Sequence, residues 1–170
     1  MQNIVARMVG AARLSRATYE EVEADTSANG QAVGIVVLYS LAAAIGANAA
    51  DPRSLIGILV VALLSWVIWV LLTLFIGTRL LPESTTRSDF GEILRTTGFS
   101  TSVGILLVFG RLPVIGGVIV AIVGIWMLVT FVVAIRQALD YSSTARALAV
   151  CVLGWVIHWV VFFGFSRTLI

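Results

Sequence analysis

The chain has 170 residues, of which 59% are hydrophobic and 12% are charged, and its mean hydropathy is +1.04. A soluble domain contains about 45–50% apolar and about 25% charged residues, so this composition excludes an ordinary water-soluble protein and indicates one integral membrane domain. The net charge of +2 is too small to indicate a nucleic-acid partner, and the single cysteine, Cys151, excludes an intrachain disulfide.

Residues 3–24 have the periodicity of an amphipathic helix. Apolar and small side chains recur at steps of three and four residues, at Ile4, Met8, Ala11, Ser15, Tyr19 and Val22. We predict a cytoplasmic N-terminal segment, residues 1–30, whose helix lies on the membrane surface with its arginines near anionic head groups. A helix packed against a partner or the bundle is the alternative. The candidate lipid or partner contacts are Met8, Arg13, Arg16 and Tyr19.

Residues 31–170 are predicted to form the transmembrane domain. The first span, residues 31–50, would be about 30 Å long as a helix, which matches the thickness of the hydrocarbon core. A short turn, Asp51-Pro52-Arg53, separates it from the second span, residues 54–81, which is long enough to tilt.

Residues 83–95 form the longest polar loop. Two helix-start patterns within it, Thr86-x-x-Asp89 and Asp89-x-x-Glu92, predict a short interfacial helix. Phe90 and Arg95 of this segment are further candidate contacts with lipid or a partner.

The third span, residues 96–110, would be only about 22 Å long as a helix. It could cross a thinned bilayer, continue the preceding helix, or re-enter on the same side; we predict a span. The fourth span, residues 112–135, has Pro113 in its first turn, where the missing N–H costs little. The fifth span covers residues 147–166.

Orientation follows from the arginines, because positive charge is enriched on the cytoplasmic side. Five spans with the N-terminus in the cytoplasm place eight arginines inside and three outside. The inner ones are Arg7, Arg13, Arg16, Arg79, Arg87, Arg95, Arg136 and Arg146, and the outer ones are Arg53, Arg111 and Arg167. We therefore predict a protein of the cell (inner) membrane with its C-terminus on the outer side.

Residues 89–155, DFGEILRTTGFSTSVGILLVFGRLPVIGGVIVAIVGIWMLVTFVVAIRQALDYSSTARALAVCVLGW, resemble the core of the Yip family of small membrane proteins. The shared pattern is a polar pre-helix, a Gly-Phe-Ser entry into a short span, a glycine-rich turn and a long span containing Ile125-Trp126. The resemblance implies a bacterial-type, five-span, non-enzymatic membrane protein. Eukaryotic relatives bind small GTPases and act in vesicle traffic, but this chain lacks their long cytosolic N-terminal region.

His158 lies near the middle of the fifth predicted span, flanked by Trp155 and Trp159, and its side chain is ionisable. Such groups usually face the protein interior, where a histidine could relay protons or bind haem or a chlorophyll-type pigment. A neutral histidine bonded to a neighbouring helix is the alternative. The predicted spans contain no acidic pair, and the chain shows no metal-ligand spacing, so we expect no catalytic residues, no metal and no cofactor.

The sequence therefore predicts an all-α, polytopic bundle that is not an enzyme. It would act as a scaffold, a membrane organiser or an accessory subunit, in contact with membrane lipids and with other membrane proteins or a second copy. A transporter or channel subunit, and an accessory subunit of an energy-converting complex, are the alternatives.

Overall fold

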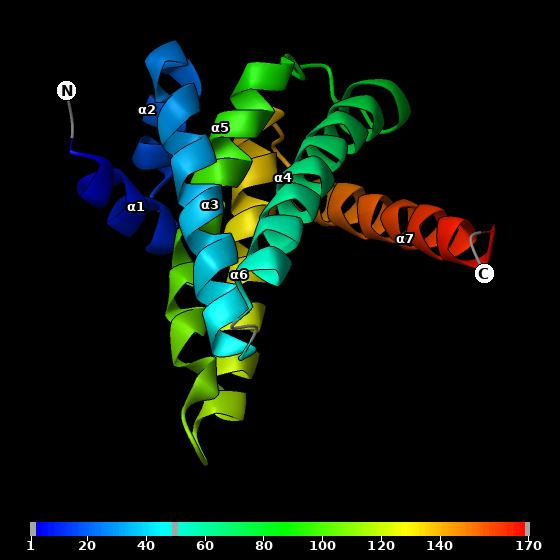
Figure 1. The fold of residues 1–170 in the computed structure, drawn as a ribbon. Helices are drawn as coiled ribbons and strands as arrows, with labels where there is room; N and C mark the ends of the chain where they lie inside the picture. Colours follow the sequence, from blue (N-terminus) through cyan, green and yellow to red (C-terminus); the bar gives the residue numbers. More distant parts are fainter. Residues whose placement is uncertain (1–2, 49–50, 169–170) are drawn as a thin grey trace.

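The computed structural model describes residues 3–48 and 51–168, with side chains at all of these except 52–54 and 158–168 (Figure 1). The described residues fold into helices. In chain order they are α1 (Ile4–Ala12), α2 (Arg16–Ala24), the 3-10 turn η1 (Thr26–Ala28), α3 (Asn29–Gly46), α4 (Pro52–Phe75), the π-helical turn η2 (Ile76–Leu80), α5 (Phe90–Ser100), the 3-10 helix η3 (Thr101–Arg111), α6 (Gly116–Ala138) and α7 (Thr144–Thr168).

The N-terminal segment contains two helices where the periodicity predicted one. Leu14 adopts a left-handed conformation with φ of 61°, and the Ser15 N–H donates to the Gly10 carbonyl at 3.0 Å, which ends α1. The Ser15 side chain then accepts from the Thr18 N–H at 3.3 Å and begins α2. Serine is a favoured N-cap residue. Because Ser15 also fits the periodicity of the stripe, the sequence pattern did not reveal that a second helix begins there.

Within the part of the chain that the structure describes, four helices are long and apolar enough to cross a membrane: Thr26–Gly46, Leu55–Leu80, Phe90–Arg111 and Gly116–Ala138. They correspond to the first four predicted spans. The end of the first predicted span, residues 49–50, lies outside the described residues.

The third predicted span is continuous with the helix before it. The predicted pattern Asp89-x-x-Glu92 forms a capping box that opens α5: the Glu92 N–H donates to Asp89 Oδ1 and the Asp89 N–H donates to Glu92 Oε2, both at 2.9 Å. Together, α5 and η3 reach about 38 Å, since a 3-10 helix rises about 2.0 Å per residue. The apparent shortness of residues 96–110 is thereby explained.

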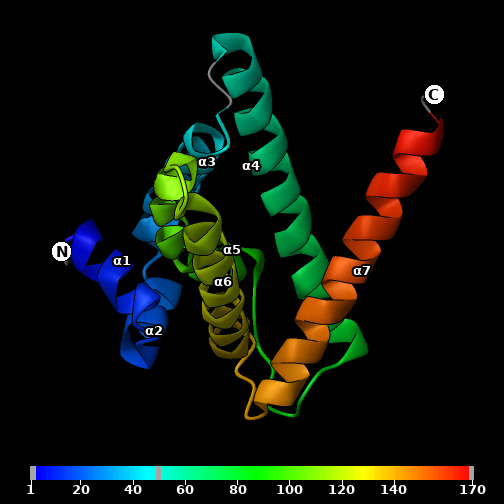
Figure 2. The same ribbon diagram turned by 90° about the horizontal axis from the view of Figure 1, so that it is seen from below.

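The fifth predicted span, residues 147–166, falls within α7. Its described side chains belong to an apolar stretch, Thr144–Ile157, and the remainder of the span lies outside the described side chains. In Figure 2, α4 and α7 meet beside the loop at residues 81–89 and diverge toward their other ends.

The α5–η3 helix is the centre of the bundle. Of the apolar window in Phe90–Arg111, 61% is buried, against 11% in Leu55–Leu80, and α3 and α6 pack along it (Figure 1). Gly46 of α3 meets the η3 backbone directly, because a Cβ there would lie 1.9 Å from the Leu107 carbonyl oxygen. Small residues at such crossings allow close packing inside a membrane.

Buried hydroxyls accompany the change from α to 3-10 geometry. Ser100, Thr101 and Ser102 each donate to the carbonyl three residues earlier, at 2.6–2.7 Å. Such bonds compete with the regular helical ladder. The Thr130 hydroxyl of α6 also lies 3.0 Å from the Ser100 carbonyl, so these polar groups link helices within the bundle.

The turn before α6 is strained. Pro113 was predicted inside the first turn of the fourth span, but α6 begins at Gly116 and Val114 has φ of 71° with 99% of its surface exposed. A left-handed conformation costs an L-residue with a Cβ roughly 1–2 kcal/mol.

Replacing Val114 with glycine should therefore raise the free energy of unfolding by about 1 kcal/mol. Thermal unfolding in detergent measures the change. The matched control is Val118→Gly at an exposed position in α6, which should lower stability by a similar amount because glycine is unfavourable within a helix. A lower melting temperature for both variants would show that the turn is not strained.

Candidate functional site

Three segments gather at one end of the bundle, toward the top of Figure 1: α2, the loop at residues 81–89, and the turn at residues 139–143. We call this surface the polar face. Its geometry depends on two buried arginines and one carboxylate.

Arg7 fixes the N-terminal segment in place. Its guanidinium is 5% exposed and donates to Glu21 at 2.8 and 3.0 Å, to Asp25 at 2.7 Å and to Gln31 at 3.1 Å. Burial acts to lower the pKa of Arg7, but the hydrogen bonds to Asp25 and Glu21 outweigh it, so the pKa lies above its usual value and the group stays charged. Arg7 thus joins α1 to the end of α2 and the start of α3.

Arg95 makes a second clamp from α5. It is 3% exposed, and its Nε lies 2.9 Å from the Val22 carbonyl and 3.0 Å from the Glu23 carbonyl. Its Nη2 also donates to Glu23 O, and its Nη1 donates to Asn29 Oδ1 at 3.0 Å. A cation at the C-terminal end of a helix satisfies unpaired carbonyls and complements the helix dipole. Arg95 therefore attaches the α2–α3 junction to the centre of the bundle.

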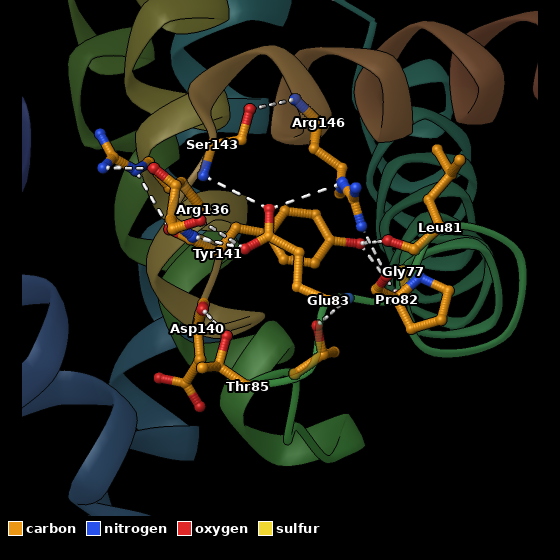
Figure 3. Close-up of polar contacts among 12 residues, drawn as sticks. Gly77, Leu81, Pro82, Glu83, Thr85, Arg136, Asp140, Tyr141, Ser143 and Arg146 are labelled. Atoms are coloured by element: carbon orange, nitrogen blue, oxygen red, sulfur yellow. Dashed lines mark hydrogen bonds and ion pairs between the residues drawn. The ribbon is translucent and has the colours of Figure 1, made fainter.

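Glu83 connects the two loops of the polar face (Figure 3). Its carboxylate accepts from the Ser142 hydroxyl at 2.7 Å, the Ser142 N–H at 2.9 Å and the Ser143 N–H at 3.4 Å, and lies 3.5 Å from Arg146 Nε. The Ser142 hydroxyl and N–H hold the pKa of Glu83 below its usual value. Arg146 also donates to the Pro82 carbonyl at 2.5 Å. The two loops are thereby held together as one surface.

Tyr141 strengthens the same junction. Its hydroxyl lies 2.9 Å from the Gly77 carbonyl and 2.7 Å from the Leu81 carbonyl, both in the turn that ends the second span (Figure 3). Arg136 donates to the Tyr141 carbonyl at 3.2 Å and to the Ser142 carbonyl at 2.9 Å. The end of α6 is consequently fixed against η2.

A polar pocket of about 390 Å³ opens on the polar face between α2 and the end of α6. Its lining includes three carboxylates and two guanidiniums, from Glu20, Glu23, Asp140, Arg16 and Arg136. Arg16 pairs with Glu20 at 2.8 Å, with both side chains exposed. Mixed charges of this kind can recognise a polar or charged partner surface. Among the described residues, no group of three or more histidine, cysteine, aspartate or glutamate side chains could hold a metal ion.

Glu23 titrates near neutrality. Burial raises its pKa to about 7, and Glu92 of α5, Asp140 after α6 and Glu20 on α2 add to the rise, while Arg95 opposes it. Because the pKa in the fold exceeds the usual 4.5, folding favours the protonated acid. The contribution of Glu23 to the free energy of unfolding is therefore greatest below about pH 4.5, and it is lost as the pH rises through about 7.

We predict that Glu23→Gln abolishes this pH dependence and leaves the protein more stable than wild type above pH 7. The measurement is the melting temperature in detergent as a function of pH. Glu20→Gln is the control: its exposed carboxylate is paired with Arg16 and is the smallest contributor to the rise, so most of the pH dependence should remain. Parallel curves for wild type and Glu23→Gln would show that folding does not shift the pKa of Glu23.

The predicted contacts with lipid or a partner separate into two groups. Met8, Arg13, Arg16 and Phe90 retain accessible surface, and Arg16 lies on the polar face. Tyr19 and Arg95 are buried, and the Tyr19 hydroxyl lies 3.3 Å from the Ala11 carbonyl and 3.2 Å from the Thr130 carbonyl. These two side chains fix the N-terminal segment onto the bundle. For all six residues, contact with lipid or a partner is still a prediction.

Two features of the site qualify the sequence reasoning. The ion pairs of Arg7 with Glu21 and Asp25 were not predicted, although both acidic residues follow at a distance that allows a helix–turn–helix to pair them with Arg7. The His158 side chain lies outside the described residues, so its proposed ligand or relay role stays a prediction.

Comparison with known proteins finds no match to a family model, a curated protein or a solved structure.

Proposed function

We propose that the chain is a non-enzymatic integral membrane protein of the Yip type that acts as a scaffold, a membrane organiser or an accessory subunit. A partner would dock on the polar face. The observation that carries this proposal is the rigid attachment of α2 by Arg7 and Arg95. Rigid surfaces bind with a smaller loss of conformational entropy, so a preorganised charged face suits recognition.

The proposed topology has five spans, with α7 as the fifth, in the inner membrane of a bacterial cell. The N-terminus and the polar face lie in the cytoplasm and the C-terminus lies outside. One feature supports this orientation: Arg16 lies on the polar face and Arg136 and Arg146 lie beside it, and arginine is enriched on the cytoplasmic side. Neighbouring membrane proteins or a second copy could pack against the exposed apolar side chains of α4 and α7.

The buried hydroxyls favour a structural role over a transport path. Ser40, Thr97, Ser100, Thr101 and Ser102 all donate to carbonyls of their own helices. A transporter or channel subunit needs polar groups that face water or a substrate.

Purification of the protein from its native membrane in a mild detergent tests the proposal. We expect a stoichiometric co-purifying chain that is lost in Glu20→Arg, which reverses a charge of the polar face, and retained in Arg111→Glu, which reverses a charge at the far end of η3. Co-purification of a coloured cofactor would favour the energy-converting complex. Solute uptake in proteoliposomes that disappears with His158→Ala would favour the transporter.

A further inference from the structure

An apolar groove runs between α1 and the helices η3 and α6. It has a volume of about 470 Å³ and is distinct from the polar pocket. Ser102 contributes the only hydroxyl among its lining residues, and the other ten are apolar. They include Val5, Met8 and Val9 from α1, Leu106 from η3, and Ile122 and Trp126 from α6.

Defined contacts fix the walls of the groove relative to one another. The indole N–H of Trp126 donates to the Ala12 carbonyl at 2.8 Å, which attaches the end of α1 to α6. Arg7 attaches α1 to the end of α2 through its ion pairs with Glu21 and Asp25. Gly10 fits closely against Thr18, since a Cβ at Gly10 would lie 2.2 Å from the threonine hydroxyl oxygen. The groove is therefore preformed and does not need a ligand to open it.

The groove belongs to the part of the chain that is suited to hydrocarbon. Phe90–Arg111 and Gly116–Ala138, which supply two of its walls, are both candidate membrane spans. Leu106 is 49% exposed and Ile122 is 63% exposed. On a membrane-spanning helix, large exposed apolar side chains contact lipid tails. The groove is thus continuous with the surface that lipid covers.

A basic residue adjoins the groove in the chain. Ala12 lines the groove and Arg13 follows it at the exposed end of α1. Arginine extends along apolar surface while placing its guanidinium near phosphate, which it binds well. We infer that the groove between α1, η3 and α6 binds one acyl chain of an anionic phospholipid, with Arg13 at the phosphate. This inference depends on the spans and not on a partner at the polar face.

The test uses the full chain in phosphatidylcholine vesicles that contain phosphatidylglycerol with a photoactivatable group on one acyl chain. We expect crosslinks on Met8 and on the stretch of α6 around Ile122. Val9→Trp, which fills the groove, should reduce this labelling about tenfold, the loss expected when about two methylenes are no longer buried. Val60→Trp at an exposed position on α4 is the matched control and should leave it unchanged.

The head-group contact is tested separately with Arg13→Gln and the same probe on phosphatidylcholine. Arg13→Gln should remove the preference for phosphatidylglycerol, whereas Arg87→Gln should retain it. Equal labelling in Val9→Trp and Val60→Trp would overturn the inference, because it would mean that lipid contacts the helices without a defined site. Labelling of the exposed side chains of α4 with none on Met8 would overturn it as well. Neither result would affect co-purification through the polar face.

Discussion

Arg95→Met should lower the free energy of unfolding by about 3 kcal/mol and release the N-terminal segment from the bundle. The substitution leaves the Val22 and Glu23 carbonyls and the Asn29 amide without the buried cation that binds them. Methionine retains much of the apolar stem, so the loss reflects the missing charge and donors. For a chain of this size the melting temperature should fall by roughly 6–12 °C.

Limited trypsin digestion gives the local measurement. Cleavage after Arg13 and Arg16 should accelerate in Arg95→Met, because α2 is no longer held. Arg87→Met is the control, since Arg87 lies exposed in the loop between the second and third spans. If Arg95→Met and Arg87→Met were digested at the same rate and melted at the same temperature, Arg95 would not hold the N-terminal segment.

Gly46→Ala should be the second large perturbation. The added Cβ would lie 1.9 Å from the Leu107 carbonyl oxygen, which belongs to backbone and has little freedom to move. Separation of α3 from η3 should cost about 3 kcal/mol, at the upper end of typical overpacking losses. The effect is measured as resistance to thermal unfolding in detergent.

Gly34→Ala provides a control on the same helix. No atom lies within 4 Å of a Cβ at Gly34, and alanine is a better helix former than glycine by up to about 1 kcal/mol. Because only Gly46 lies against backbone, the two substitutions should change the stability in opposite directions. A loss of similar size at both positions would point to a general intolerance of α3 to alanine.

The helical architecture followed from the sequence because long apolar runs and capping patterns are local signals. Asp89 and Glu92 predicted where α5 begins, and the capping box confirms it. The third span was harder to predict, because residues 96–110 alone are too short to cross the hydrocarbon core. Only their continuity with α5 gives a helix of sufficient length. Periodicity placed Tyr19 and Val22 on one stripe, and both are buried.

The polar face was not predictable as a unit because its contacts join distant residues. Arg95 meets Glu23 across 72 positions and Glu83 meets Ser142 across 59. An arginine near a membrane surface has the same appearance in a sequence whether it faces a lipid phosphate or a buried carbonyl. The break at Leu14 was also missed, because Ser15 fits both an apolar stripe of small residues and a helix N-cap.

Cysteine accessibility is the most direct test of the central claim, that a bundle of membrane helices holds the polar face on one side of the bilayer. In a Cys151→Ser background, single cysteines replace Ala17 and Ser84 at the polar face, and Ala47 and Val114 at the opposite turns. All four positions are exposed. With a membrane-impermeant thiol reagent, Ala47→Cys and Val114→Cys should react in intact cells. Ala17→Cys and Ser84→Cys should react only after permeabilisation. Reaction of Ala47→Cys and Ser84→Cys from the same side would contradict the account.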